Sequence, residues 1–197
     1  MSTTKDIQTR MNPAEALEQL KSGNERYLTG KRLSRDYSRE LRDTAGGKFP
    51  FAAILGCIDS RATAEQLFDQ GVGDLFNARV AGNIVNEDIL GSLEYACNVA
   101  GAMLILVLGH TACGAVTAAT QQVELGNITA LLSKITPVVD SLDAEVTVDE
   151  VAEHNVQHSI ERIRKESTIL KDMELEGEIL IKGAMYDVAT GKVRFLD

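Results

Sequence analysis

Two short apolar runs, Phe51–Leu55 and Met103–Leu108, constrain the fold of this chain more than any other feature. Each has the length and composition of a β-strand that is buried on both faces. Amphipathic segments with helical spacing lie before, between and after them. Because strands that alternate with helices form mostly parallel sheets, the sequence predicts an α/β fold, with a central β-sheet flanked by helices.

Caps, spacing and turn residues predict the other elements. We expect helices over residues 12–27, 38–45, 63–70, 86–99, 114–125, 127–139 (interrupted at Pro137) and 148–165. Further strands are expected over 74–79, over 178–188 with an irregularity at Gly183, and over 192–196 as a C-terminal edge strand. No linker interrupts the chain, so residues 1–197 are predicted to form a single domain, with 1–48 as an N-terminal helical arm and loop and 49–197 as the core.

Composition excludes several classes of function. The chain has 197 residues and a formal net charge of −9, which disfavours binding to nucleic acid or to an anionic membrane surface. No apolar run approaches the roughly 20 residues of a membrane span. The N-terminal residues lack the apolar core of a signal peptide, so we expect no export and a cytoplasmic location. Three cysteines are too few for a disulfide framework and indicate metal ligands or buried thiols.

The residues that follow the two apolar runs carry the chemistry. Cys57 follows the first run, and His110 and Cys113 follow the second. Ligands bind at the carboxyl ends of parallel strands, where these side chains are expected to meet. Thiolate and imidazole are preferred zinc ligands, and three protein ligands with one open position are typical of catalytic zinc. We therefore predict one Zn²⁺ per chain, held by these three side chains.

Asp59 and Arg61 lie close enough to the first cysteine to face the same site. Asp59 could bind the metal as a fourth ligand and close the site, or it could accept a hydrogen bond from a metal-bound water. A guanidinium can clamp a carboxylate with two parallel hydrogen bonds, so Arg61 could hold Asp59 off the metal and keep it ionised.

Other candidate ligands have simpler interpretations. Cys97 lies among apolar neighbours on a predicted helix, which favours core packing. His154 and His158 have the spacing of a helical metal-binding pair, but no cysteine is nearby and glutamates flank them, which favours a solvated helix face.

The combination Cys57-x-Asp59-Ser60-Arg61 and His110-x-x-Cys113-Gly114 resembles the β-class carbonic anhydrases, and more specifically their bacterial members. Other segments spread over nearly the whole chain are also similar to that family: residues 16–24, 73–76, 79–83, 92–95, 106–110 and 183–193. The resemblance implies a lyase that reversibly hydrates carbon dioxide to bicarbonate and a proton, by attack of zinc-bound hydroxide on CO₂.

By motif, the resemblance assigns zinc to Cys57, His110 and Cys113, and a catalytic dyad to Asp59 and Arg61. It further implies that Phe76 and Tyr95 line a narrow apolar CO₂ pocket, often across a dimer interface. The backbone N–H of Gly114 matches a position that binds a substrate oxygen.

The family also implies a homodimer or homotetramer in which N-terminal helices pack on the partner. Two positions depart from its pattern. Lys48 stands where the family often has a glutamine that binds substrate, and Thr63 stands where a proline is usual, so a looser loop around the dyad is expected.

Two alternatives remain open. The same scaffold could hydrolyse CS₂ or carbonyl sulfide, which are also small, linear and apolar. Alternatively, the chain could be a non-catalytic zinc-binding subunit, although a structural site has no need of the Asp59–Arg61 pair.

Overall fold

A computed structural model describes residues 2–196, and within them one five-stranded sheet has the order β2-β1-β3-β4-β5. The strands are β1 (Ala52–Gly56), β2 (Leu75–Arg79), β3 (Leu104–His110), β4 (Leu180–Tyr186) and β5 (Val193–Phe195). The first four run parallel, and β5 pairs antiparallel with β4 at one edge. This arrangement confirms the predicted α/β fold with its mostly parallel sheet.

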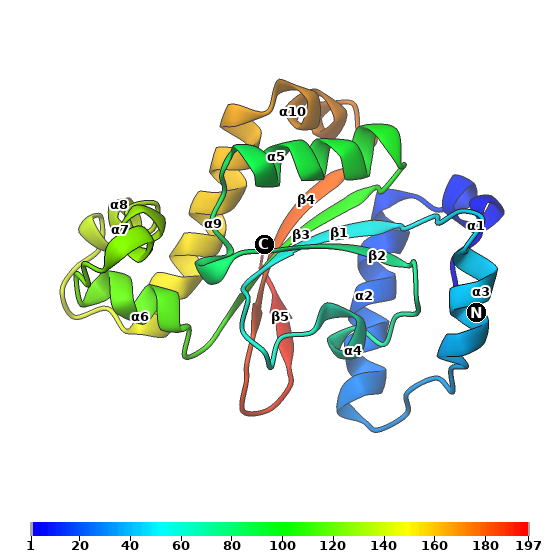
Figure 1. Ribbon diagram of the computed structural model, residues 1–197, viewed down its shortest axis with the longest axis horizontal. Coiled ribbons are helices and arrows are strands. Elements are labelled where there is room, and N and C mark those ends of the chain that lie inside the picture. The colour runs from blue at the N-terminus through cyan, green and yellow to red at the C-terminus, as the bar shows by residue number, and fades with distance from the viewer. Residues whose placement is uncertain (1, 197) are drawn as a thin grey trace.

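Helices cover both faces of the sheet (Figure 1). One face carries α5 (Glu87–Glu94), α9 (Val148–Glu166) and α10 (Thr168–Leu175), and the other carries α2 (Pro13–Leu28) and α4 (Ala64–Leu67). The remaining helices are α1 (Lys5–Arg10), α3 (Tyr37–Thr44), α6 (Gly114–Thr120), α7 (Gly126–Leu132) and α8 (Thr136–Asp140), with a 3₁₀ turn η1 (Ala81–Asn83) and a π turn η2 (Tyr95–Val99).

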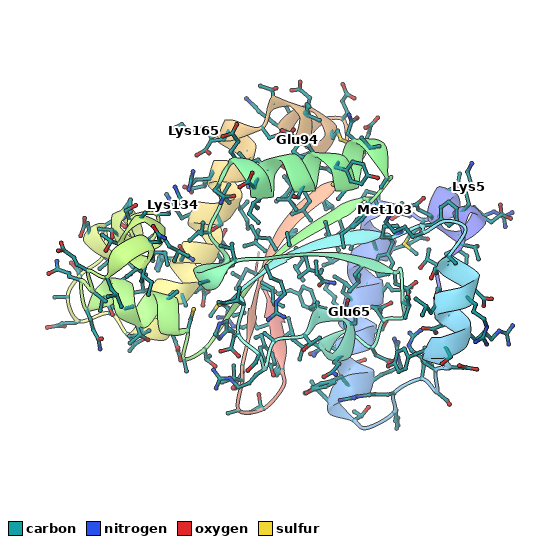
Figure 2. The ribbon with its side chains drawn as sticks, in the orientation of Figure 1. Lys5, Glu65, Glu94, Met103, Lys134 and Lys165 are labelled. Carbon is teal, nitrogen blue, oxygen red and sulfur yellow. The ribbon has the colours of Figure 1, made fainter. Side chains whose placement is uncertain are left out.

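The core consists of two apolar layers, one on each face of the sheet. Every residue of β1 and β3 is buried, because both strands lie inside the sheet and are covered on both sides. Side chains fill the space between the sheet and the helices, while the labelled Lys5 and Lys165 extend outward from α1 and α9 (Figure 2). The buried centre thus fixes the strand ends that carry the candidate ligands.

The long helix α9 packs unusually close to the sheet, and two glycines permit it. A Cβ atom at Gly109 would lie 2.6 Å from Val156 Cγ2, and one at Gly183 would lie 2.8 Å from Val156 Cγ1. The predicted irregularity at Gly183 is wrong, since β4 runs unbroken through it. Its glycine reflects helix–sheet contact rather than a break in pairing.

The N-terminal helix α2 begins with Asn12 as its N-cap and Pro13 in its first turn, and the structure adds a capping box between Asn12 and Glu15. Its residues Ala16 and Leu20 are fully buried against the sheet of the same chain. The amide of Asn24 donates to the carbonyls of Leu67 and Gly191, both at 3.1 Å. The buried side of α2 thus packs within its own chain, and the packing of N-terminal helices on a partner stays a prediction.

Several boundaries also differ from the sequence prediction. The expected 63–70 and 114–125 helices shorten to α4 and α6, and the helix expected over 86–99 becomes a π turn from Tyr95 onward. Helices α1 and α10 were not predicted. Among residues 2–196, no helix is both long and apolar enough to cross a membrane.

Candidate metal centre and catalytic dyad

Cys57, His110 and Cys113 come together at the carboxyl ends of β1 and β3. The parallel register pairs Gly56 with Leu108, so the segments that follow both strands leave the sheet at the same edge. One ligand atom from each of the three side chains lies within 4.8 Å of the other two, and all three residues are buried. In residues 2–196, they form the single grouping of this kind. The predicted clustering is confirmed.

The imidazole of His110 is oriented for metal binding. Its Nδ1 lies 2.9 Å from the Thr111 carbonyl oxygen, which can only accept, so Nδ1 carries the proton. Nε2 is buried and has no hydrogen-bond partner among the described residues. Its lone pair is therefore available to a cation. Two sulfur donors and one such nitrogen fit Zn²⁺ with a fourth position left for water or substrate.

The loop that carries His110 and Cys113 is held from two neighbouring elements. The Thr111 N–H donates to the Tyr186 carbonyl at the end of β4. The Ala112 N–H donates to Asp149 Oδ1 at 2.8 Å, from the first turn of α9. Ala112 has a φ of 52°, a left-handed conformation that costs a residue with a side chain some strain. These bonds hold a strained turn that presents both ligands.

A hydrogen bond between the thiols of Cys57 and Cys113 shifts their pKa values in opposite directions. A hydrogen bond from Cys113 lowers the pKa of Cys57, and the same bond raises the pKa of Cys113. The Gly82 N–H also donates to Cys57 Sγ at 3.3 Å, which favours its thiolate. Cys97 behaves differently, since burial raises its pKa to about 12. Cys97 is part of the apolar core, as predicted.

Asp59 and Arg61 form a bidentate pair beside this cluster. Arg61 Nε donates to Asp59 Oδ1 at 2.9 Å, and Nη2 donates to Oδ2 at 2.7 Å. The Arg61 backbone N–H adds a third bond to Oδ1 at 2.9 Å. These hydrogen bonds hold the pKa of Asp59 well below its usual range, so the carboxylate is ionised. Asp59 is not among the clustered ligand atoms.

The backbone of the loop that carries Cys57, Asp59 and Arg61 accepts hydrogen bonds from residues outside the loop. Arg79 donates through Nε to the Cys57 carbonyl at 2.8 Å and through Nη2 to the Asp59 carbonyl at 2.5 Å. The Tyr186 hydroxyl lies 3.4 Å from the Arg61 carbonyl, and burial raises its pKa. Our sequence interpretation assigned Arg79 and Asp149 no role. Arg79 is a charged residue at the end of β2, the strand that pairs with β1. Its position at that strand end is the sequence signal that could have identified it.

The predicted substrate residues divide between two places. Gly114 begins α6 directly after Cys113, and a Cβ atom there would meet no atom of residues 2–196 within 4 Å. Phe76 and Tyr95 instead contact each other edge to face, with ring centroids 6.2 Å apart, beside a hollow of about 690 Å³. Phe76 pairs with Ala53, four residues before Cys57, which is about 13 Å along the strand.

Lys48 lies beside the same aromatic pair, since its ammonium is 5.6 Å from the centre of the Phe76 ring. Tyr95 is 52% exposed. A single chain thus leaves these aromatic side chains away from the metal cluster and open to a neighbour.

On α9, His154 is exposed and His158 is partly buried beside Arg162, which agrees with the helix-face interpretation.

Comparison with known proteins agrees with this geometry. A family model described as carbonic anhydrase matches residues 52–193. "Carbonic anhydrase 2" of Mycobacterium tuberculosis is 35% identical over 194 residues, which cover 94% of each chain. A carbonic anhydrase of Mycolicibacterium smegmatis is 35% identical over 191 residues, which cover 92% of each chain.

A solved structure of the Coccomyxa β-carbonic anhydrase in complex with acetazolamide superimposes with a TM-score of 0.73 at 28% identity. The match covers 81% of this chain and 77% of that one. The family model covers more than two thirds of the chain and the relatives match most of it, so this chain belongs to the β-carbonic anhydrase family.

Proposed function

We propose that this protein is a zinc-dependent carbonic anhydrase that reversibly hydrates CO₂ to bicarbonate and a proton. The observation that carries the proposal is the buried group of Cys57, His110 and Cys113 next to the ion pair of Asp59 and Arg61. Family membership supports the reaction, since CO₂ hydration is the family's function.

Cys57, His110 and Cys113 would hold one Zn²⁺ per chain. When bound, the ion acts as a Lewis acid that lowers the pKa of a coordinated water from 15.7 to about 7. The protein contributes a buried site and an imidazole fixed in one tautomer by the Thr111 carbonyl. Zinc rather than another metal is favoured by the two thiolate ligands.

Asp59 would orient the reacting water. Its Oδ1 already accepts two hydrogen bonds from Arg61, whereas Oδ2 accepts one. Oδ2 therefore has a lone pair to accept a hydrogen bond from the water that attacks CO₂. Arg61 prevents Asp59 from turning toward the metal as a fourth ligand, and the Gly114 N–H would bind a substrate oxygen.

We infer that the complete site uses two chains, in a homodimer or in a homotetramer built from such dimers. Phe76, Tyr95 and Lys48 lie together, and the strand position of Phe76 is about 13 Å along the sheet from that of its own Cys57. Placed against the metal cluster of a second copy, the two rings would form the apolar wall of a CO₂ pocket. The half-exposed Tyr95 ring supports such a contact.

The site residues also suggest how the chain is organised. Residues 49–197 would form the catalytic core and residues 1–48 an arm that stabilises it.

A cytoplasmic location is supported by three cysteines that remain free thiols in the described residues.

Stopped-flow measurement of CO₂ hydration tests the reaction. We expect one zinc per chain and turnover well above buffer at pH about 8.5, where a site with two thiolates is active. Activity restricted to CS₂ or carbonyl sulfide would favour the related hydrolase. A zinc-loaded protein without hydration of either kind would favour the non-catalytic subunit.

Subunit complementation tests the two-chain site. Asp59→Asn and Phe76→Ala chains are each expected to be weakly active alone. After mixed refolding, half of the dimers would pair the two variants, and each such dimer would contain one site with neither defect. The mixture would then recover about a quarter of wild-type activity. No recovery in verified mixed dimers would mean that each site takes both residues from one chain, and it would overturn the shared arrangement.

A further inference from the structure

Arg79 ends β2 beside the loop that carries the first ligand and the dyad. The parallel register pairs Arg79 with Gly56, and the Val80 N–H continues the ladder to the Gly56 carbonyl at 3.0 Å. The Arg79 side chain therefore emerges where β1 stops and residue 57 begins. Its guanidinium reaches two carbonyl oxygens of that loop, Cys57 O at 2.8 Å and Asp59 O at 2.5 Å.

Both accepting residues belong to the site. Cys57 is a metal ligand, and Asp59 is the carboxylate of the dyad, so one cation spans the backbone of both. The loop has no regular structure over residues 57–59, and Ile58 between them is 62% exposed. Apolar packing at Ile58 therefore contributes little to holding the loop in place.

The loop also lacks a rigid residue on its far side. Residue 63 is a threonine, so no proline ring fixes the backbone φ there. Within the loop, the Ala62 N–H bonds to the Asp59 carbonyl at 3.1 Å. That local turn shapes residues 59–62 but does not tie them to the sheet. The tie to β2 comes from Arg79.

Arginine suits this task for a geometric reason. Its planar guanidinium carries Nε and Nη2 donors in a fixed fork, so two carbonyls two residues apart can be held at once. Lysine would keep the charge but offer a compact ammonium on a flexible stem, without that fork.

We propose that Arg79 is a positioning residue that fixes the Cys57–Asp59 segment and so keeps Asp59 paired with Arg61. This inference rests on the proposed carbonic anhydrase activity. Arg79 acts through Asp59 and does not itself touch substrate. Its loss would lower turnover by loosening the dyad, while the three metal ligands remain in the chain.

A double-mutant cycle tests this coupling. Arg79→Lys in the wild-type background is expected to lower kcat by about 10- to 100-fold, the range seen when a catalytic group is misplaced by about 1 Å. In the Asp59→Asn background, the same change is expected to lower kcat less than about threefold, because the group it positions is already disabled. Equal losses in both backgrounds would overturn the proposal.

Two further measurements separate positioning from unfolding. Arg79→Lys should retain about one zinc per chain, and hydrogen–deuterium exchange should rise in the peptide that covers residues 57–62. Arg164→Lys is the matched control, because Arg164 also uses its Nε and Nη2 donors together, on Glu174 between α9 and α10. This control should change neither exchange in that peptide nor kcat.

The outcomes distinguish the two proposals. A zinc-loaded wild-type protein that does not hydrate CO₂ refutes the proposed function, and the exchange measurement then still tests the loop contact. Active wild-type protein with unchanged kcat and unchanged exchange in Arg79→Lys refutes the role of Arg79 alone.

Discussion

Two glycines directly precede metal ligands, and they provide a matched test of how the sheet positions the site. Gly109 precedes His110 at the end of β3, and Gly56 precedes Cys57 at the end of β1. A Cβ atom at Gly109 would lie 2.6 Å from Val156 Cγ2 and 2.7 Å from Met185 Sδ. At Gly56, no atom of residues 2–196 would lie within 4 Å.

The expected magnitudes follow from these distances. Carbon contacts are optimal near 3.5–4.0 Å, so Gly109→Ala overlaps Val156 by about 1 Å. Overpacking of this kind costs about 1–3 kcal/mol, and removal of a glycine from a strand returns about 0.5–1 kcal/mol. We therefore expect a net loss of about 0–2.5 kcal/mol for Gly109→Ala, and a neutral or slightly stabilising effect for Gly56→Ala.

Urea unfolding at a fixed protomer concentration measures both changes, since the stability of an oligomer depends on concentration. Each 1 kcal/mol corresponds to about 2–4 °C in Tm for a chain of this size. A chelator competition measures zinc affinity in the same samples. Gly109→Ala should also weaken zinc binding by about tenfold or more, because the backbone shift displaces the His110 imidazole.

The difference in stability between the two variants tests whether the contact with α9 limits side-chain size at Gly109. If Gly109→Ala and Gly56→Ala differ by less than about 0.5 kcal/mol, then the close approach of α9 does not limit side-chain size at Gly109. If Gly109→Ala is destabilised but binds zinc normally, then the strand end is not what places His110.

Three further predictions concern single side chains. Asp59→Ala should retain one zinc per chain by metal analysis but lose most CO₂ hydration; zinc lost together with activity would contradict the assigned role. Cys97→Ser should leave zinc content and turnover near normal, and a large drop in zinc would show that this thiol had been misassigned. Because Arg61 holds the pKa of Asp59 below its ordinary value, the ion pair contributes stability that is fully present above the ordinary pKa of about 3.9 and is lost as the pH falls further. The unfolding free-energy difference between wild type and Asp59→Asn should thus stay constant from about pH 5 to 8 and shrink below about pH 4; a difference that changes between pH 6 and 8 would contradict this.

Much of the candidate site could be predicted because its signals are local. A cysteine or histidine directly after a buried apolar run lies at a strand end whatever the rest of the fold does, and parallel strands place such ends together. Cys57 and His110 could therefore be assigned before their distance was known. The pairing of Asp59 with Arg61 was also predictable, since only two residues separate them along the chain.

Other features depend on contacts between distant segments. The hydrogen bond from Arg79 to the Cys57 carbonyl joins residues 22 positions apart and requires the observed pairing of Gly56 with Arg79. A shift of the register by one residue would turn that side chain to the other face of the sheet. The burial of Ala16 and Leu20 within their own chain likewise depends on where α2 docks, which an amphipathic stripe does not specify.

Apolar run length and short-range spacing predict the fold class, the clustering of Cys57, His110 and Cys113, and the contact between Asp59 and Arg61. Contacts between elements set the unbroken course of β4, the close packing of α9 on Gly109 and Gly183, and the placement of Phe76 and Tyr95 away from the Cys57 cluster. The physical reason is that these features are distances between elements. Such distances are set by register and by packing of complementary side-chain shapes, and neither is encoded in any one segment.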